Sequence, residues 1–198
     1  MKRPMSTISS STGASGNLCT QFLDLLCKDG GTWQAEPALG NLVPFNGKPK
    51  FAYGVQMRFW RRPEKTPSNF VLTSGRSWPA GADKDEKGMH YETGFMRCNA
   101  KAELEWNIAS NNGAVEVVRG KVVLTRMASA RAIMMPQGVL NLGDRTATKR
   151  ILEMPVVDGV TPRQGLLHEF YMPSKEGDGP LIEHLRDQML PVPPGMPW

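Results

Sequence analysis

Alternation of apolar and polar side chains is the main pattern in the central part of the chain. Residues 88–97 (GMHYETGFMR) and 103–120 (ELEWNIASNNGAVEVVRG) change residue type with the period of two that strands show. The residues between them have the length of a hairpin loop. Asn111-Asn112-Gly113 offers a second turn, because Asn and Gly tolerate positive φ. We therefore expect a meander of antiparallel strands, with His90 near its start.

Similar alternation is found on both sides of this region. Leu18–Lys28 instead repeats apolar residues at helical spacing before Asp29-Gly30-Gly31, which predicts one short amphipathic helix. Strand-like segments begin at Trp33. The further predicted strands are 51–61, 70–74, 114–119, 121–127, 132–135, 139–142, 149–157, 165–173 and 181–190. We expect an all-β protein: an antiparallel up-and-down barrel of about ten strands with a short N-terminal helix. Such a barrel has an interior wide enough for a small ligand.

The predicted organisation is one domain with two tails in 198 residues. Residues 1–17 are rich in Ser and contain no acidic residue, so we expect them to be a disordered tail, because such a segment cannot bury enough apolar surface to offset its ordering entropy. Residues 18–190 form the barrel. Residues 191–198 are a Pro-rich extended C-terminal tail. The irregular stretch 79–87 is expected to be a surface loop.

Composition narrows the function classes. The net charge of +5 is modest and favours solubility over a nucleic-acid surface. The basic and aromatic run 57–62 (MRFWRR) is better explained by the alternating faces of a barrel wall than by single-strand binding. No apolar run is long enough to span a membrane. Cys19, Cys27 and Cys98 lack metal-type spacing, and their odd number argues against a disulfide framework. We therefore expect a reducing, cytoplasmic location and neither a nucleic-acid nor a membrane partner.

The residues alone point to no particular reaction. The chain has no Gly-rich phosphate loop and no nucleophile elbow. Its only His residues are His90, His168 and His184, and a His on a strand is usually an ordinary polar residue. The 12 Met suggest an adaptable apolar ligand site, because Met fills irregular cavities.

Several segments, in order, carry a resemblance to a known family. They are Gly31-Thr32-Trp33, 51–59 (FAYGVQMRF), 89–95 (MHYETGF), Glu103-Leu104 with 113–117 (GAVEV), and 166–172 followed by 180–185 (PLIEHL). Together they resemble the nitrobindin family of ten-stranded barrels, which carry haem in a partly open mouth and belong with the fatty-acid-binding and calycin barrels. The resemblance covers residues 18–190.

The resemblance implies a site and an activity. His184 stands at the position of the axial ligand of haem b, and a neutral imidazole suits iron. Met89, His90, Ser110 and Met172 stand where the family lines its cavity. Family members bind nitric oxide and isomerise peroxynitrite to nitrate at ferric haem. The expected ligand is therefore nitric oxide or peroxynitrite, and a homodimer is left open.

The chain also departs from the family. Where the family has G-x-W-x-G-x-G-x-G, residues 31–40 read GTWQAEPALG, so Ala35 and Pro37 replace two glycines. This motivates an alternative, a haem-free barrel that binds or transforms a small apolar metabolite. Its activity would be of an isomerase or cyclase type, with His90 and Glu92 as the acid/base pair. Whether the chain is an enzyme stays open between the two hypotheses.

Regular alternation makes one further prediction about His184. It should share a face with Ile182 and Arg186, leaving Glu183 and Leu185 on the other face. Arg186 could then pair with a propionate or another carboxylate.

Overall fold

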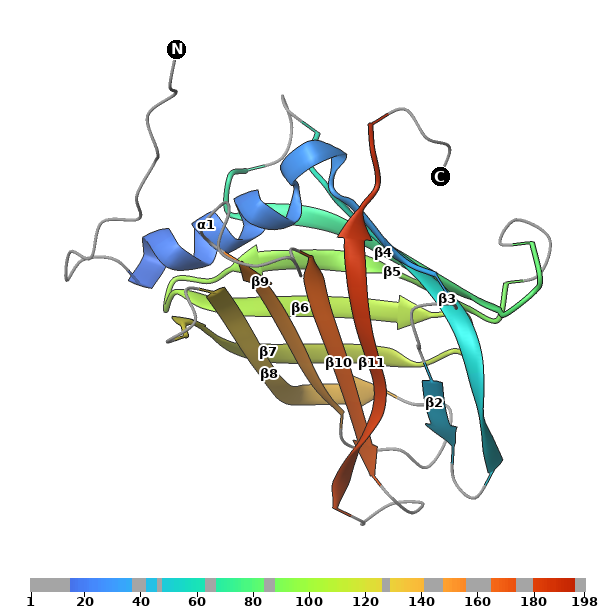
Figure 1. The fold of residues 1–198 in the computed structure, drawn as a ribbon. Coiled ribbons are helices and arrows are strands. Elements are labelled where there is room, and N and C mark those ends of the chain that lie inside the picture. Colours follow the sequence, from blue (N-terminus) through green and yellow to red (C-terminus); the bar gives the residue numbers. More distant parts are fainter. Residues whose placement is uncertain are drawn as a thin grey trace.

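The computed structural model describes residues 15–36, 42–45, 48–62, 67–83, 88–125, 129–140, 148–155, 165–173 and 180–194. The described part contains two helices and eleven strands (Figure 1). The helices are α1 (Ser15–Leu26) and the short 3-10 helix η1 (Lys28–Gly30). The strands are β1 (Thr32–Ala35), β2 (Leu42–Phe45), β3 (Lys48–Trp60), β4 (Phe70–Pro79), β5 (His90–Cys98), β6 (Glu103–Ser110), β7 (Val115–Leu124), β8 (Ser129–Leu140), β9 (Lys149–Pro155), β10 (Leu166–Pro173) and β11 (Leu181–Pro191).

The strands form one antiparallel sheet that closes on itself. Each strand from β3 to β11 pairs with the next along the chain, and β1 closes the ring by pairing with both β11 and β3. Ten strands, β1 and β3–β11, make up the closed barrel, while β2 pairs with β3 beside it. Closure pairs the backbone N–H and C=O groups that the edge strands of an open sheet would expose. The predicted all-β barrel of about ten strands with a short N-terminal helix is confirmed.

Several element boundaries differ from the prediction. β7 joins the segments predicted at 114–119 and 121–127, and β8 likewise unites two predicted segments. Gly120 does not end β7: a Cβ there would lie 1.7 Å from the Ile133 carbonyl oxygen, so glycine lets the neighbouring strand approach. α1 begins at Ser15, so residues 15–17 are helical rather than part of the tail. The remainder of that tail, residues 195–198 and part of the predicted loop 79–87 lie outside the described residues.

α1 covers one end of the barrel (Figure 1). It packs against β5, β6 and β7 and buries an apolar face made of Cys19, Phe22, Leu23 and Leu26. Gly31 turns the chain from the helices into β1 at a φ of 65°, and a Cβ there would lie 1.9 Å from the Phe59 carbonyl oxygen. Only glycine fits such a position. No helix in the described part of the chain is long and apolar enough to cross a membrane.

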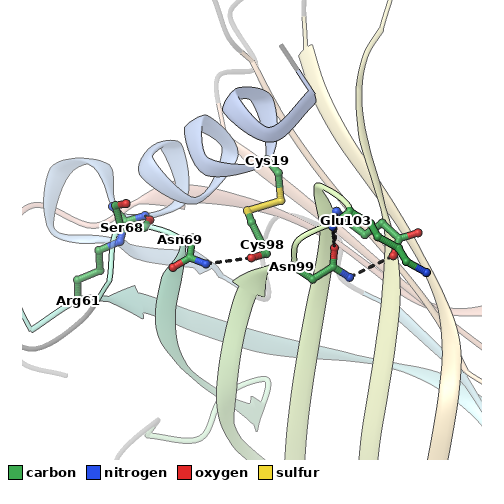
Figure 2. The surroundings of a disulfide bond; sticks show 8 residues. Cys19, Arg61, Ser68, Asn69, Cys98, Asn99 and Glu103 are labelled. Atoms are coloured by element: carbon green, nitrogen blue, oxygen red, sulfur yellow. Dashed lines mark hydrogen bonds between the residues drawn. A yellow bond between two sulfur atoms is a disulfide. The ribbon is translucent and has the colours of Figure 1, made fainter. Parts of the chain in front are cut away.

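A disulfide joins Cys19 of α1 to Cys98 at the end of β5 (Figure 2). The two Cα atoms are 5.9 Å apart, within the range that a disulfide spans. The expectation that the cysteines form no disulfide is therefore wrong. An odd count excludes complete pairing but not one bridge with one free thiol, here Cys27. Disulfides are rare in reducing compartments, so the cysteines no longer support the predicted cytoplasmic location.

Alternate residues of each strand face the barrel interior. The buried side chains of the strands share one hydrophobic core with α1. They include Trp106, Met57, Phe59, Met96, Leu104, Met134 and Leu152. The opposite end of the barrel, which we call the far end, is where β5, β7, β9 and β11 begin and β4, β6, β8 and β10 end.

Candidate functional site at the far end of the barrel

All the site residues predicted from the sequence lie toward the far end of the barrel. His90 and Glu92 lie at the start of β5, Ser110 ends β6, Met172 lies near the end of β10, and His184 lies near the start of β11. Register supports this arrangement, because Glu92 pairs directly with Ser110. The roles assigned to these residues remain predictions.

Met89 directly precedes β5. Its backbone N–H donates to the Ser77 carbonyl oxygen at 2.8 Å, which anchors the start of β5 to β4. Its side chain is exposed, and the Met172 side chain is half-buried. The thioethers of Met89 and Met172 therefore both lie in the half of the barrel where an apolar ligand at the far end would bind.

His184 lies at a β-bulge. Phe170 pairs with Leu185 and Tyr171 pairs with Glu183, so β11 has one residue more than β10 at this point. The His184 ring meets the Phe170 ring edge-on, with centroids 6.0 Å apart and planes at 75°. The bulge therefore sets the His184 imidazole against an aromatic ring that faces the barrel interior.

The same bulge overturns the alternation predicted for β11. Leu185 packs against the core rather than facing away from it. Arg186 lies on the outer surface with a 60% exposed side chain, and its Nε is 3.6 Å from Glu169 Oε1. Arg186 thus pairs with a carboxylate, as predicted, but its predicted position near the pocket is wrong, because one extra residue in β11 shifts every later side chain to the other face.

A buried arginine occupies the interior just below the far end. Arg150 of β9 donates to Glu92 Oε2 on β5 at 3.1 Å and to both carboxylate oxygens of Glu116 on β7 at 3.3 Å. Its guanidinium also lies over the rings of Trp106 and Phe170, 4.9 and 4.6 Å from their centroids. We call Arg150, Glu92 and Glu116 the Arg150 cluster. It links β5, β7 and β9 across the interior.

The cluster fixes the charges of its members. Burial alone would raise the pKa of Glu92, but Arg150 and the nearby His90 and His168 lower it to about 2. Burial alone would lower the pKa of Arg150, yet the two carboxylates raise it further above its usual range. Arg150 therefore stays a cation and Glu92 an anion at neutral pH.

This changes the expected roles of His90 and Glu92. The imidazole Nε2 of His90 lies 3.6 Å from Glu92 Oε2, and 41% of its side chain is exposed, so it is accessible for proton exchange. Glu92, in contrast, stays ionised and bonded to Arg150, so it has no proton to donate near pH 7. Of the predicted acid/base pair, only His90 keeps the freedom that proton transfer requires.

Sequence reasoning missed Arg150 and Glu116. One signal was present: Arg150 shares its strand face with Leu152 and Met154, which are both buried. A cation on the apolar face of a strand must either reach water or find anions inside. The sequence does not say which anions, because they come from two other strands.

Known proteins resemble this chain over most of its length. A family model described as THAP4-like, heme-binding beta-barrel domain matches residues 29–189. The crystal structure of Rv2717c from M. tuberculosis resembles the barrel with a TM-score of 0.62 and 20% sequence identity, covering 83% of this chain and 92% of that one. A search of curated proteins finds no match. At this identity the structural likeness shows the fold alone.

Proposed function

The chain belongs to the family of THAP4-like, haem-binding β-barrel domains, and from this premise we propose that it binds haem b at the far end of the barrel with His184 as the axial ligand. The observation that carries the proposal is the bulge in β11, which sets the His184 imidazole against the inward-facing Phe170. One imidazole is enough for an iron that brings four porphyrin nitrogens with it.

The residues at the far end fit a haem in their chemistry. Besides the His184 imidazole they include the thioethers of Met89 and Met172 and the aliphatic side chain of Ile182, which pairs with Met172. Below them the Arg150 cluster fills the interior between Trp106 and Phe170. These residues would therefore hold a porphyrin at the far end of the barrel, where the nitrobindin resemblance implies a partly open mouth.

The chain's own residues would have distinct roles. Phe170, edge-on to His184, would help to orient its ring, and Arg150 packs against Phe170 from the interior side. Met89, Ser110 and Met172 would line the cavity. His90, the exposed imidazole, would exchange protons with solvent close to the bound ligand.

The bound haem would supply reversible binding of nitric oxide and isomerisation of peroxynitrite to nitrate. Isomerisation of peroxynitrite would make the chain an enzyme, and reversible binding of nitric oxide would make it a sensor or carrier.

A hemin titration followed at the Soret band tests the proposal. Wild type should bind hemin stoichiometrically with a sharp shift, and His184→Ala should lose it. His90→Ala is the matched control, since it removes another imidazole of the same end and should still bind hemin. Retention of the wild-type Soret band by His184→Ala would refute the ligand assignment. The absence of any shift in wild type would refute haem binding itself.

The alternative, a haem-free barrel acting on an apolar metabolite, rests on the altered glycine segment at residues 31–40. His90 would then act without Glu92 as a proton donor, for the reason given above. A panel of apolar metabolites offered to the apo barrel tests it. If the apo barrel takes up none of these metabolites but binds hemin, the haem function is the one that remains supported.

A further inference from the structure

His90 and His184 lie on opposite walls of the far end. In the closed ring, β5 is separated from β11 by β4, β3 and β1 on one side and by the strands from β6 to β10 on the other. His90 shares a strand face with Glu92, whose carboxylate bonds Arg150 in the interior. His90 therefore belongs to the inner face of β5, at the rim of the barrel. A ligand that His184 holds from one side would meet His90 on the other.

A continuous chain of contacts joins the two imidazoles through the interior. Glu92 Oε2 lies 3.6 Å from His90 Nε2 and accepts from Arg150 Nη2 at 3.1 Å. Arg150 in turn lies over the Phe170 ring, which meets the His184 ring edge-on. Because Arg150 is buried and bonds two carboxylates, its movement toward solvent would leave both of them buried without a cation. The chain is therefore fixed at its centre.

The carboxylate of Glu92 decides which nitrogen of His90 is available to a ligand. Although burial would raise it, the pKa of Glu92 is held at about 2 by Arg150, so this carboxylate is an anion that can only accept hydrogen bonds. The nitrogen that faces it, Nε2, therefore carries a proton in both the neutral and the charged form of the His90 ring. Nδ1 is the nitrogen left for a ligand. Carboxylates orient imidazoles in the same way at metal and catalytic sites.

Glycine at position 75 makes room for this carboxylate. Gly75 of β4 is the direct partner of Glu92 on β5. A Cβ on Gly75 would lie 2.9 Å from Glu92 Cγ and 3.1 Å from Glu92 Oε1. Any side chain at position 75 would therefore displace Glu92 and change its contacts with His90 and Arg150. Residues from β4, β5 and β9 thus support one geometry of the His90 ring.

We propose that His90 contacts the bound ligand from the wall opposite His184, with Nδ1 toward the ligand. Glu92, Arg150 and Gly75 position the His90 ring and do not themselves touch the ligand. The inference rests on the proposed haem function and deepens it, because it assigns the second side of the ligand site. The ligand class that fits is a small polar molecule or anion that shares one hydrogen bond with Nδ1, as peroxynitrite can through its oxygen atoms.

The full haem-free chain labelled with ¹⁵N-histidine tests the positioning. The Nε2–H of His90 should give an observable resonance in wild type, because its contact with Glu92 slows exchange of the proton with solvent. Glu92→Gln should lose it, since Arg150 takes the one amide oxygen and the NH₂ group then faces Nε2. Gly75→Ala should weaken it. The matched control is Glu105→Gln, because Glu105 also bonds two arginines but lies on the outer face. No such resonance in wild type, or an unchanged one in Glu92→Gln, would overturn the positioning.

Azide binding to the hemin-loaded chain tests the ligand contact. His90→Leu should take up hemin but bind azide about tenfold more weakly, through the loss of one hydrogen bond. Gly75→Ala should weaken azide binding in the same direction, and Glu105→Gln should match wild type. Wild-type azide affinity in His90→Leu would overturn the contact. If wild type takes up no hemin, the proposed function fails and the ligand contact with it, whereas the Nε2–H resonance of the haem-free chain still decides the positioning.

Discussion

Replacing Arg150 by methionine is the sharpest test of how this barrel is held together. Arg150 is 3% exposed, bonds two carboxylates and lies between two aromatic rings. Arg150→Met keeps much of the volume and the apolar contacts but leaves Glu92 and Glu116 buried without their cation. Removing one partner of a buried ion pair typically costs about 3–5 kcal/mol.

The pKa of Glu92 gives an independent estimate. Its folded pKa of about 2 lies below the unfolded value of about 4.3, a difference of roughly two units or about 3 kcal/mol. Because the folded pKa is depressed, this stabilisation is present above pH ~4.3 and is lost as the pH falls toward 2. In Arg150→Met the pKa of Glu92 should instead be raised by burial, so protonation now favours the folded state.

Urea unfolding of both proteins at pH 4.5 and pH 7.5 measures the effect. Arg150→Met should lose about 3–5 kcal/mol at pH 7.5, and the difference from wild type should shrink at pH 4.5. Arg150→Met combined with Glu92→Gln and Glu116→Gln should recover part of the loss, because the charges are gone. A loss under 1 kcal/mol at pH 7.5, or an equal loss at both pH values, would refute the reasoning.

Three further outcomes are expected. The double variant Cys19→Ala/Cys98→Ala should lose about 4 kcal/mol of stability, because the disulfide closes a loop with a sequence separation of 79 residues. Cys27→Ser, which removes the free thiol, is the control. Equal unfolding midpoints for wild type, the double variant and Cys27→Ser would contradict the bridge. Gly31→Ala should destabilise the barrel by more than about 1 kcal/mol through its positive φ and the clash with the Phe59 carbonyl. Gly81→Ala, with a positive φ but open space, should cost less in the same thermal melts, and the reverse order would refute the clash. Glu105 on the outer face of β6 is covered by its partners Arg97 and Arg119, whose own side chains reach solvent. Glu105→Gln should therefore cost up to about 1 kcal/mol at pH 7, and a larger loss would show that the two pairs act as a buried network.

The fold could be predicted because its determinants are local. In an up-and-down meander each strand pairs with its neighbour in sequence, so alternation and turn residues specify most of the architecture. The boundary errors came from positions such as Gly120, where a residue that usually interrupts strands instead permits close packing.

The site could be predicted only in part, for a physical reason. The resemblance named His184, and alternation placed it on a strand, but alternation cannot reveal a bulge, because a bulge depends on the register with β10. The Arg150 cluster joins three strands, and the disulfide joins a helix to a strand end. Such contacts arise from closure of the barrel, and no local pattern encodes them.

Arg150 contacts the surroundings of His184, and this gives a way to separate local from global effects. Its guanidinium lies over the Phe170 ring, which meets the His184 ring edge-on. Loss of Arg150 should therefore change the hemin spectrum. Loss of the Cys19–Cys98 disulfide removes comparable stability from the opposite end of the barrel and should leave that spectrum unchanged. If both variants altered the spectrum equally, the site would be responding to stability alone, and the geometric link through Arg150 would be wrong.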